Sequence, residues 1–396
     1  MPSLAADLQA AAGIGADPNG GITRFAWSAE LAAANAWLVE RLAELGLETE
    51  LDAAGNVLGR WQAGEGKAVL LGSHLDTVPC GGRYDGALGV LAGLEVVRRL
   101  RAEGVELRRP LWLVSFNDEE GGRLQTGMLG SRAFVGDLDL EDWRRRGVAD
   151  AMVTAGFDFE RLPEARGIDG VGAYLELHIE QGPRLERSGR DLGIVTAITG
   201  MLGFRARFLG EANHAGTTPM EHRRDALAGA AKAVLALRDE ARASEDMTAN
   251  VGVIAAEPGG FNVVPGAAEF TIDMRSPTPM GFERSDRFAR ETLERIAEEE
   301  GLGLELAETH RKEPVTLDPE LLRALEVAAE AEGASFTRMA SGAGHDAMVL
   351  AHHVPAAMLF VPSRGGLSHC AEEFTPPEQC ELGARVLARA VRELVI

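Results

Sequence analysis

Two strongly apolar segments with a helical segment between them constrain the fold of this chain more than any other feature. Residues 68-AVLLGS-73 and 111-LWLVSF-116 are expected to form strands, and 86-GALGVLAGLEVVRRLRAEG-104 predicts a helix over about 86–103. This order forms a parallel βαβ unit, and strands buried on both faces are nearly continuous apolar runs. The pattern predicts an α/β fold with a mostly parallel central sheet.

A second domain is expected because 396 residues are too many for one ordinary core. The elements expected over about 203–312 follow the order strand, helix, strand, strand, helix, strand: 204–210, 222–243, 250–256, 268–276, 282–301 and 303–309. This βαββαβ order is that of a ferredoxin-like unit. We therefore expect an inserted domain at 203–312, with 1–202 and 313–396 forming the parent domain.

Charge and cysteine content exclude several classes of protein. Sixty-one acidic against forty basic side chains give a net charge of −21, which repels nucleic acid and anionic membrane surfaces. The three cysteines form no CxxC pair, so neither a disulfide framework nor a thiolate zinc site is expected. Residues 1–21 lack a basic segment followed by an apolar one, and no apolar run reaches about 18 residues. We expect a cytoplasmic protein.

Side chains that bind metal ions follow or lie in four of the expected strands. They are His74 and Asp85, Glu119 and Glu120, His178 in 174-YLELHIEQGP-183, and His369 after 356-AAMLFV-361. Ligand crevices of open α/β sheets form at the carboxyl ends of the strands. Two metal ions about 3.5–4 Å apart need a bridging carboxylate and about two further ligands each, which imidazole and carboxylate supply for zinc, manganese, cobalt or nickel.

Six such side chains leave one carboxylate to spare. We assign Glu120 to metal binding and Glu119 to proton transfer, and expect Asp76 to accept a hydrogen bond from the imidazole of His74. Each residue also has a simpler interpretation: a histidine is often solvated, paired acids often form a wet surface, and Asp85 suits a glycine-rich turn. Their common place after apolar strands favours the metal site.

Five segments together resemble a known family: GSHLDTVPCGGRYDGALGV, NDEEGGR, LELHIEQGP, NHAGTTPM and RGGLSHC. They resemble the metallopeptidase-like (M20-type) amidohydrolases over nearly the whole chain, and within them the N-carbamoyl-L-amino-acid hydrolases and allantoate amidohydrolases. The resemblance implies these metal ligands: His74, Asp85 as the bridge, Glu120, His178 and His369. It also implies that Glu119 is the base. His178 departs from the peptidase branch, which has a carboxylate there, and HIEQGP is typical of the carbamoylase branch.

The same resemblance implies that the inserted domain is a lid and a dimerisation surface. It places His214 across a homodimer, where it polarises the scissile carbonyl, and assigns Asn262 and Arg275 to the α-carboxylate of the substrate. Gln181 and Gly344, the latter in 341-SGAGHDAM-348, are expected to line the same pocket. Taken alone, His214 is more typical of a loop histidine that caps a turn, and Arg275 is more typical of a residue that pairs with Asp273 or caps an edge strand.

The predicted function is hydrolysis of the carbamoyl C–N bond of N-carbamoyl-L-amino acids by a homodimer with two divalent metal ions per subunit. The nearest alternative is the same chemistry on allantoate. An aminoacylase or dipeptidase is disfavoured by His178. A non-catalytic binding protein on the same fold would be expected to lack the base or a ligand, and neither is missing.

Overall fold

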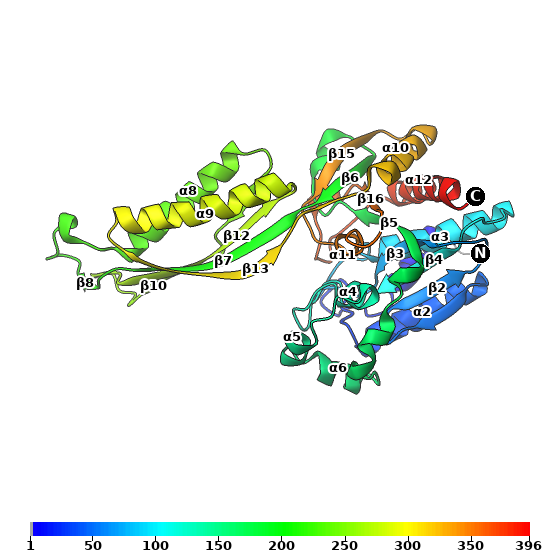
Figure 1. The fold of residues 1–396 in the computed structure, drawn as a ribbon, viewed down its shortest axis with the longest axis horizontal. Coiled ribbons are helices and arrows are strands. Elements are labelled where there is room, and N and C mark those ends of the chain that lie inside the picture. The colour runs from blue at the N-terminus through cyan, green and yellow to red at the C-terminus, as the bar shows by residue number, and fades with distance from the viewer. Residues whose placement is uncertain (1–2) are drawn as a thin grey trace. The chain divides into compact units, whose positions relative to one another are not determined.

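The computed structural model describes residues 3–396 and divides into two compact units. The first comprises Met1–Thr196, Leu317–Met339 and Ala343–Ile396, and the second comprises Ala197–Thr316 with Ala340–Gly342. Helices and strands alternate in the first unit, and two long helices accompany a separate sheet in the second (Figure 1). The expected α/β class with a central sheet is confirmed.

The central sheet has nine strands in the order β1-β2-β4-β3-β5-β16-β6-β14, with β15 also paired to β6. Their bounds are β1 (Glu48–Leu51), β2 (Val57–Trp61), β3 (Ala68–His74), β4 (Leu111–Phe116), β5 (Val171–Ile179), β6 (Leu192–Ile198), β14 (Val315–Thr316), β15 (Phe336–Ser341) and β16 (Ala356–Val361). The middle strands β4, β3, β5 and β16 are mutually parallel. Their carboxyl ends therefore meet at one edge.

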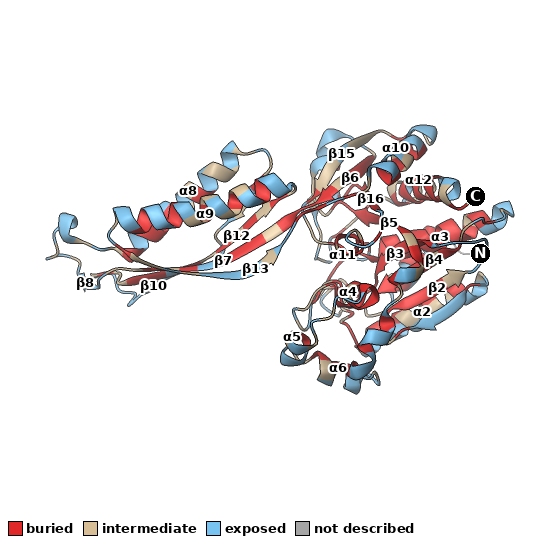
Figure 2. Ribbon diagram, viewed as in Figure 1, coloured by how far each residue is buried: buried red, intermediate tan, exposed pale blue. Residues whose placement is uncertain are grey.

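The middle strands are buried because helices cover the sheet, as the colouring of Figure 2 shows. The helices of the first unit are α1 (Leu4–Ala12), α2 (Ala29–Glu44), α3 (Ala87–Glu103), α4 (Leu129–Val135), α5 (Leu140–Arg145), α6 (Val148–Thr154), α7 (Arg184–Ser188), α10 (Pro319–Ala331), α11 (Asp346–Leu350) and α12 (Pro377–Val395). Helix α3 packs against β3 and α12. It is buried along nearly its whole length, which explains its apolar sequence.

The second unit has a mainly antiparallel sheet in the order β10-β12-β7-β13, with β9 paired to β12, and a separate ribbon of β8 and β11. Its elements are β7 (Gly200–Leu209), β8 (Asn213–His214), α8 (Ala226–Ala243), β9 (Thr248–Asn250), β10 (Ile254–Glu257), β11 (Val263–Val264), β12 (Ala267–Ser276), α9 (Pro279–Glu299) and β13 (Gly303–Lys312). Helices α8 and α9 pack on β7 and β12. A core that includes Phe204, Phe208, Phe270 and Phe282 joins these layers.

Three sequence expectations differ from the structure in detail. Helix α8 begins at Ala226 because the Asp225 side chain accepts hydrogen bonds from the first turn. The strand expected at 250–256 is two short strands, β9 and β10. The polar face of β5 is as buried as its apolar face, since β5 is a central strand and helices α3, α11 and α12 pack against it.

Candidate metal and active site

The edge where the parallel strands end brings the predicted ligands of the first unit together. His74 is the last residue of β3 and is in register with Phe116, the last residue of β4. Asp85 lies at the start of α3, next to Gly86, whose φ is 64°. A Cβ at Gly86 would lie 2.4 Å from Nε2 of His74, so glycine is needed for the ring to approach this loop.

One group that can hold a metal ion consists of His74, Asp85 and His178. Asp85 Oδ1 lies 3.2 Å from Nε2 of His178 and 3.8 Å from Nε2 of His74. All three side chains are buried. His178 comes from the central strand β5. The two residues of this group with the shortest contact, Asp85 and His178, are therefore 93 positions apart in the sequence (178 − 85).

A second group consists of Asp85, Glu120 and His369. Nε2 of His369 lies 3.3 Å from Asp85 Oδ2 and 3.4 Å from Glu120 Oε2. Asp85 is common to both groups and turns one carboxylate oxygen toward each. The structure thus brings together the five residues that the sequence singled out as ligands.

The spacing of the ligand atoms fits metal ions. Ligands at about 2.0–2.1 Å from a tetrahedral zinc ion are separated from one another by about 3.3 Å. Three of the distances given above, 3.2, 3.3 and 3.4 Å, match this separation. Imidazole and carboxylate donors are also the types that zinc, manganese, cobalt and nickel accept.

Hydrogen bonds fix the two buried imidazoles with Nε2 toward Asp85. Nδ1 of His178 lies 2.9 Å from the carbonyl of Ile179, and Nδ1 of His74 lies 3.0 Å from the carbonyl of Asp76. The expectation for Asp76 was wrong in one respect, because its backbone oxygen rather than its carboxylate is the nearest acceptor; the carboxylate is 3.6 Å away. The carboxylate instead accepts the N–H groups of Glu119 and Glu120 at 3.3 and 3.1 Å. Asp76 therefore orients both the first histidine and the paired acids.

Glu119 lies close to these groups without belonging to either. Its Oε2 is 3.7 Å from Nε2 of His74, and the residue is 9% exposed. Burial, and then the charges of Asp346 and Glu120, raise the pKa of Glu119 well above its usual range. A buried carboxyl group that holds a proton readily is suited to act as a general base or acid.

The charges of the metal-free site compensate one another. Burial raises the pKa of Asp85, but hydrogen bonds to His178 and His369 outweigh burial and hold that pKa well below its usual range. The hydrogen bond to Asp85 raises the pKa of His369 to about 9. Burial lowers the pKa of His178, but the bond to Asp85 outweighs it and brings the pKa to about 9. Without metal, protons on the imidazoles supply the positive charge that balances Asp85.

A third group of buried side chains, Glu176, His178 and His345, lies behind the first. The oxygens of Glu176 already accept hydrogen bonds from Ser73, Tyr174 and the N–H of Ala347. This group is therefore less suited to an ion than the two that share Asp85. The alternation of apolar and polar residues in β5 placed Glu176 and His178 on one face of the strand. This alternation was the only sequence pattern that indicated the third group.

Two residues expected near the substrate lie beside the predicted ligands. The side-chain nitrogen of Gln181 donates to Asp85 Oδ2 at 2.8 Å and lies 3.4 Å from Nε2 of His369. Gly344 lies in the loop before α11, next to His345, whose ring centroid is 4.5 Å from that of His178. Sequence reasoning missed Ser368 and Glu373, which also contact the Asp85 loop.

The remaining predicted residues lie in the second unit. His214 and Asn262 lie together, because β8 pairs with β11 and Asn262 accepts a backbone hydrogen bond from Ala215 at 2.9 Å. Both residues are exposed. Arg275 bonds to Asp273 through Nε at 2.9 Å and to the carbonyl of Gly342 at 2.9 Å. The pairing with Asp273 is the alternative left open for Arg275 from the sequence.

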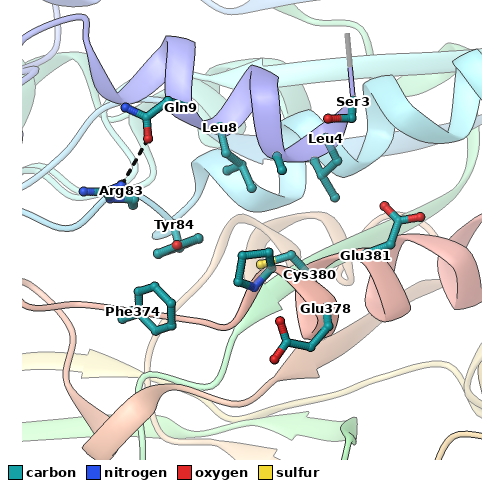
Figure 3. Close-up of a pocket in the computed structure, with 12 residues that line it drawn as sticks. Ser3, Leu4, Leu8, Gln9, Arg83, Tyr84, Phe374, Glu378, Cys380 and Glu381 are labelled. Atoms are coloured by element: carbon teal, nitrogen blue, oxygen red, sulfur yellow. Dashed lines mark hydrogen bonds between the residues drawn. The ribbon is translucent and has the colours of Figure 1, made fainter.

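A cavity of about 580 Å³ lies elsewhere in the first unit, between α1, the loop before α3 and the start of α12 (Figure 3). Leu4, Leu8, Tyr84, Phe374 and Cys380 are among its lining residues. None of the predicted ligands lines it. Tyr84 nevertheless immediately precedes Asp85, so the cavity adjoins the loop that carries Asp85.

Within residues 3–396, none of the helices combines the length and the hydropathy needed to cross a bilayer. All three cysteines are free thiols.

Comparison with known proteins finds relatives over nearly the whole chain. The model of the Peptidase family M20/M25/M40 matches residues 70–393. An N-carbamoyl-L-amino acid amidohydrolase of Geobacillus stearothermophilus is 40% identical over 389 residues, covering 96% of this chain and 95% of the relative. An allantoate amidohydrolase of Bacillus subtilis is 38% identical over 390 residues, covering 96% and 94%.

Solved structures agree with the sequence relatives. A hydantoinase/carbamoylase family amidase from Burkholderia ambifaria superimposes with a TM-score of 0.89 at 35% identity, covering 99% of this chain and 97% of that one. The expected class of enzyme, an amide-cleaving hydrolase, is confirmed by these relatives. The chain belongs to the Peptidase family M20/M25/M40.

Proposed function

We propose that this protein hydrolyses the carbamoyl C–N bond of N-carbamoyl-L-amino acids with two divalent metal ions per subunit, giving the L-amino acid, carbon dioxide and ammonia. One observation carries the proposal: Asp85 turns its two carboxylate oxygens toward two separate sets of ligands. The substrate class follows the Geobacillus relative. It also agrees with His178, where the peptidase branch is expected to carry a carboxylate.

The ligand roles follow from the two groups. His74 and His178 would hold one ion, Glu120 and His369 would hold the other, and Asp85, which belongs to both groups, would serve both. Two such ions lower the pKa of a water molecule and polarise a carbonyl group. Zinc, manganese, cobalt and nickel all suit these donors.

Glu119 is the proposed base. It accepts a proton from the attacking water and returns the proton to the leaving nitrogen, so that the C–N bond breaks and an amine departs. The 3.7 Å between Glu119 and His74 and the raised pKa of Glu119 support this role. With the amino-acid nitrogen as the leaving amine, the carbamic acid that remains decomposes to carbon dioxide and ammonia.

The second unit is proposed to be a ferredoxin-like lid and dimerisation domain inserted at 203–312, between catalytic segments 1–202 and 313–396. In chain order, β7, α8, β10, β12, α9 and β13 follow βαββαβ, and their antiparallel sheet order supports this assignment. Strand β10 is an edge of that sheet and carries the exposed Ile254, next to the exposed Val253. Unpaired edges with apolar side chains are suited to pairing with a second chain.

The positions of His214 and Arg275 within this unit support action across a homodimer. Arg275 pairs with Met201 near one end of β7, whereas β8 lies beyond the other end, where Ala267 pairs with Leu209 (Figure 1). Eight residues separate Ala267 from Arg275, which is about 27 Å at about 3.4 Å per residue. A small substrate cannot contact both side chains of one rigid unit, so we assign them to different subunits.

His214 has the geometry of a donor. Its Nδ1 accepts the N–H of Gly216 at 3.0 Å, so the neutral ring carries its proton on Nε2. That proton can bond to the oxygen of a scissile carbonyl. Asn262 beside it and Arg275 of the other subunit are proposed to bind the carboxylate, which requires Arg275 to release Asp273.

Allantoate is the second candidate substrate, since the Bacillus subtilis relative is named an allantoate amidohydrolase. The chemistry and the proposed residues are the same. A cytoplasmic location agrees with the three free cysteines.

The test is ammonia release by chelator-stripped protein reloaded with manganese, cobalt, nickel or zinc. Substrates are N-carbamoyl-L- and D-amino acids, allantoate and N-acetyl amino acids. Release from the carbamoyl-L series alone supports the proposal, and release from allantoate favours the second candidate. Amine release from acetylated substrates without ammonia release from the others would contradict both.

The subunit arrangement is tested by mixing two inactive variants, His214→Ala and Arg275→Ala. If the residues act across a homodimer, a mixture of the two partly recovers activity because some sites receive both native side chains. A fully active monomer in sedimentation would contradict this arrangement.

A further inference from the structure

A buried carboxyl group joins two loops that carry proposed metal ligands. Glu373 lies between β16 and α12 and is 3% exposed. Its Oε1 accepts the backbone N–H of Tyr84 at 2.9 Å and that of Asp85 at 3.1 Å. The side chain therefore ties the loop after β16 to the loop that ends in Asp85, 288 residues away.

Ser368 completes a ring of hydrogen bonds around Asp85. Its Oγ lies 2.9 Å from Glu373 Oε2 and 3.0 Å from Asp85 Oδ2. Glu373 thus holds the backbone of Asp85 directly, and it lies beside Ser368, whose single hydroxyl proton can be donated either to Glu373 Oε2 or to Asp85 Oδ2. The same carboxylate oxygen, Oδ2, faces the ligand His369.

Gly82 provides the space for this carboxyl group. A Cβ at residue 82 would lie 1.9 Å from Oε1 of Glu373 and 2.0 Å from its Cδ. The φ of Gly82 is outside the left-handed region, so the backbone conformation does not itself require glycine. The close approach of Glu373 is the reason that no side chain fits there.

An aromatic residue adjoins each of the two loop residues: Tyr84 precedes Asp85, and Phe374 follows Glu373. The rings of Tyr84 and Phe374 meet edge to face at 6.0 Å and 83°, and both line the cavity of Figure 3. Glu373 itself is buried. Hydrogen bonds are stronger in such surroundings, whereas a buried carboxyl group that lacks partners would be costly.

We propose that Glu373 is a positioning residue that fixes the carboxylate of Asp85 between the two ligand groups. The inference rests on the proposed function, because it takes Asp85 as the bridge. A purely structural tie between loops would lower stability when removed but would leave metal affinity unchanged. Metal affinity therefore separates the two roles.

The experiment measures the number and the dissociation constants of cobalt(II) ions bound by the chelator-stripped full chain, by competition with a chromophoric chelator. Glu373→Ala is expected to lower the affinity for at least one ion by about 10–100-fold, as does the loss of other residues that hydrogen-bond to metal ligands. Gly82→Ala is expected to do the same, because its Cβ displaces the carboxyl group. Glu372→Ala is the matched control, since this neighbouring acid is exposed.

Glu373→Gln should restore affinity close to that of the unaltered chain. Its amide oxygen can accept both N–H groups, and its amide nitrogen can donate to Ser368, whose proton then goes to Asp85. Thermal unfolding of the metal-free variants shows whether each one is folded.

Unchanged affinity for both ions in folded Glu373→Ala would overturn the proposal, and equal losses in the Gln and Ala variants would overturn the hydrogen-bond ring. If Glu373→Ala does not fold, Gly82→Ala is measured instead, and unchanged affinity for both ions in that variant would likewise overturn the proposal. An unaltered chain that binds fewer than two ions would instead contradict the proposed function.

Discussion

Replacement of Gly86 by alanine tests whether His74 lies against the Asp85 loop. The new Cβ would lie 2.4 Å from both Nε2 and Cε1 of His74, where ordinary contacts begin at 3.4 Å. The ring must therefore move by about 1 Å, which exceeds the tolerance of about 0.2 Å for a metal–ligand distance. His74 should then bind its ion poorly.

The size of the effect has two parts. The affinity for one ion should fall by at least the 10–100-fold that follows the loss of a residue hydrogen-bonded to a metal ligand. At about 1.4 kcal/mol per tenfold, this is about 1.4–2.7 kcal/mol of binding free energy. Separately, Gly86 has φ 64° and ψ −49°, a sparsely populated conformation that costs an L-residue about 1–3 kcal/mol of folding stability. The first part acts on the metal site and the second on the fold.

A control separates these two parts. Gly104 has a similar φ of 67°, but a Cβ there meets nothing within 4 Å. Gly104→Ala should also lower the unfolding midpoint of the metal-free protein, by less than Gly86→Ala because Gly104 has the left-handed helical conformation and no clash, yet it should bind both ions normally in a cobalt(II) titration. Normal binding of two ions by Gly86→Ala would refute the arrangement of His74 and Asp85 described above.

Three further predictions concern the base, the histidines and the second unit. Glu119→Gln should retain two ions by elemental analysis but lose nearly all turnover; substantial activity would remove Glu119 from the role of base. The pKa values of about 9 for His178 and His369 lie above the usual 6.5, so their protonation stabilises the metal-free fold below about pH 6.5, and this contribution is lost as pH rises through about 9. Metal binding at pH 7 should therefore release protons and tighten as pH is raised toward 9, which calorimetry in buffers of different ionisation enthalpy measures; no proton release would contradict these values. Phe270→Ala removes a fully buried ring and should cost about 3–5 kcal/mol in denaturant unfolding, whereas a loss below about 1 kcal/mol would contradict the packing of that core.

Local patterns predicted the strands that carry the site. The apolar runs at 111–116 and 356–361 coincide with β4 and β16, and β3 extends one residue beyond the expected 68–73, to include His74. These runs are readable because a strand covered on both faces is apolar at nearly every residue. Short sequence motifs likewise predicted the family, and the match to the family model confirms this prediction.

Other parts of the structure could not be predicted correctly from the sequence. The strand expected at 250–256 is interrupted, because a run of apolar and small residues does not reveal where a ladder of hydrogen bonds breaks. Asp76 was assigned a bond through its carboxylate, but the chain turns so that its carbonyl is closer to His74. Backbone geometry of this kind leaves no periodic signal.

The sequence by itself determined the type of fold, the loops that carry chemistry and the kinds of side chain available for metal ions. The tertiary structure alone decided which of these side chains meet: Asp85 with His178 and His369, and Glu373 with the space left by Gly82. It also decided that Arg275 lies near one end of the β7–β12 pair, whereas His214 lies in the separate β8–β11 ribbon beyond the other end. Periodicity reports the neighbours of a residue along its own helix or strand, whereas these contacts depend on strand order and register, which are set by the packing of the whole chain.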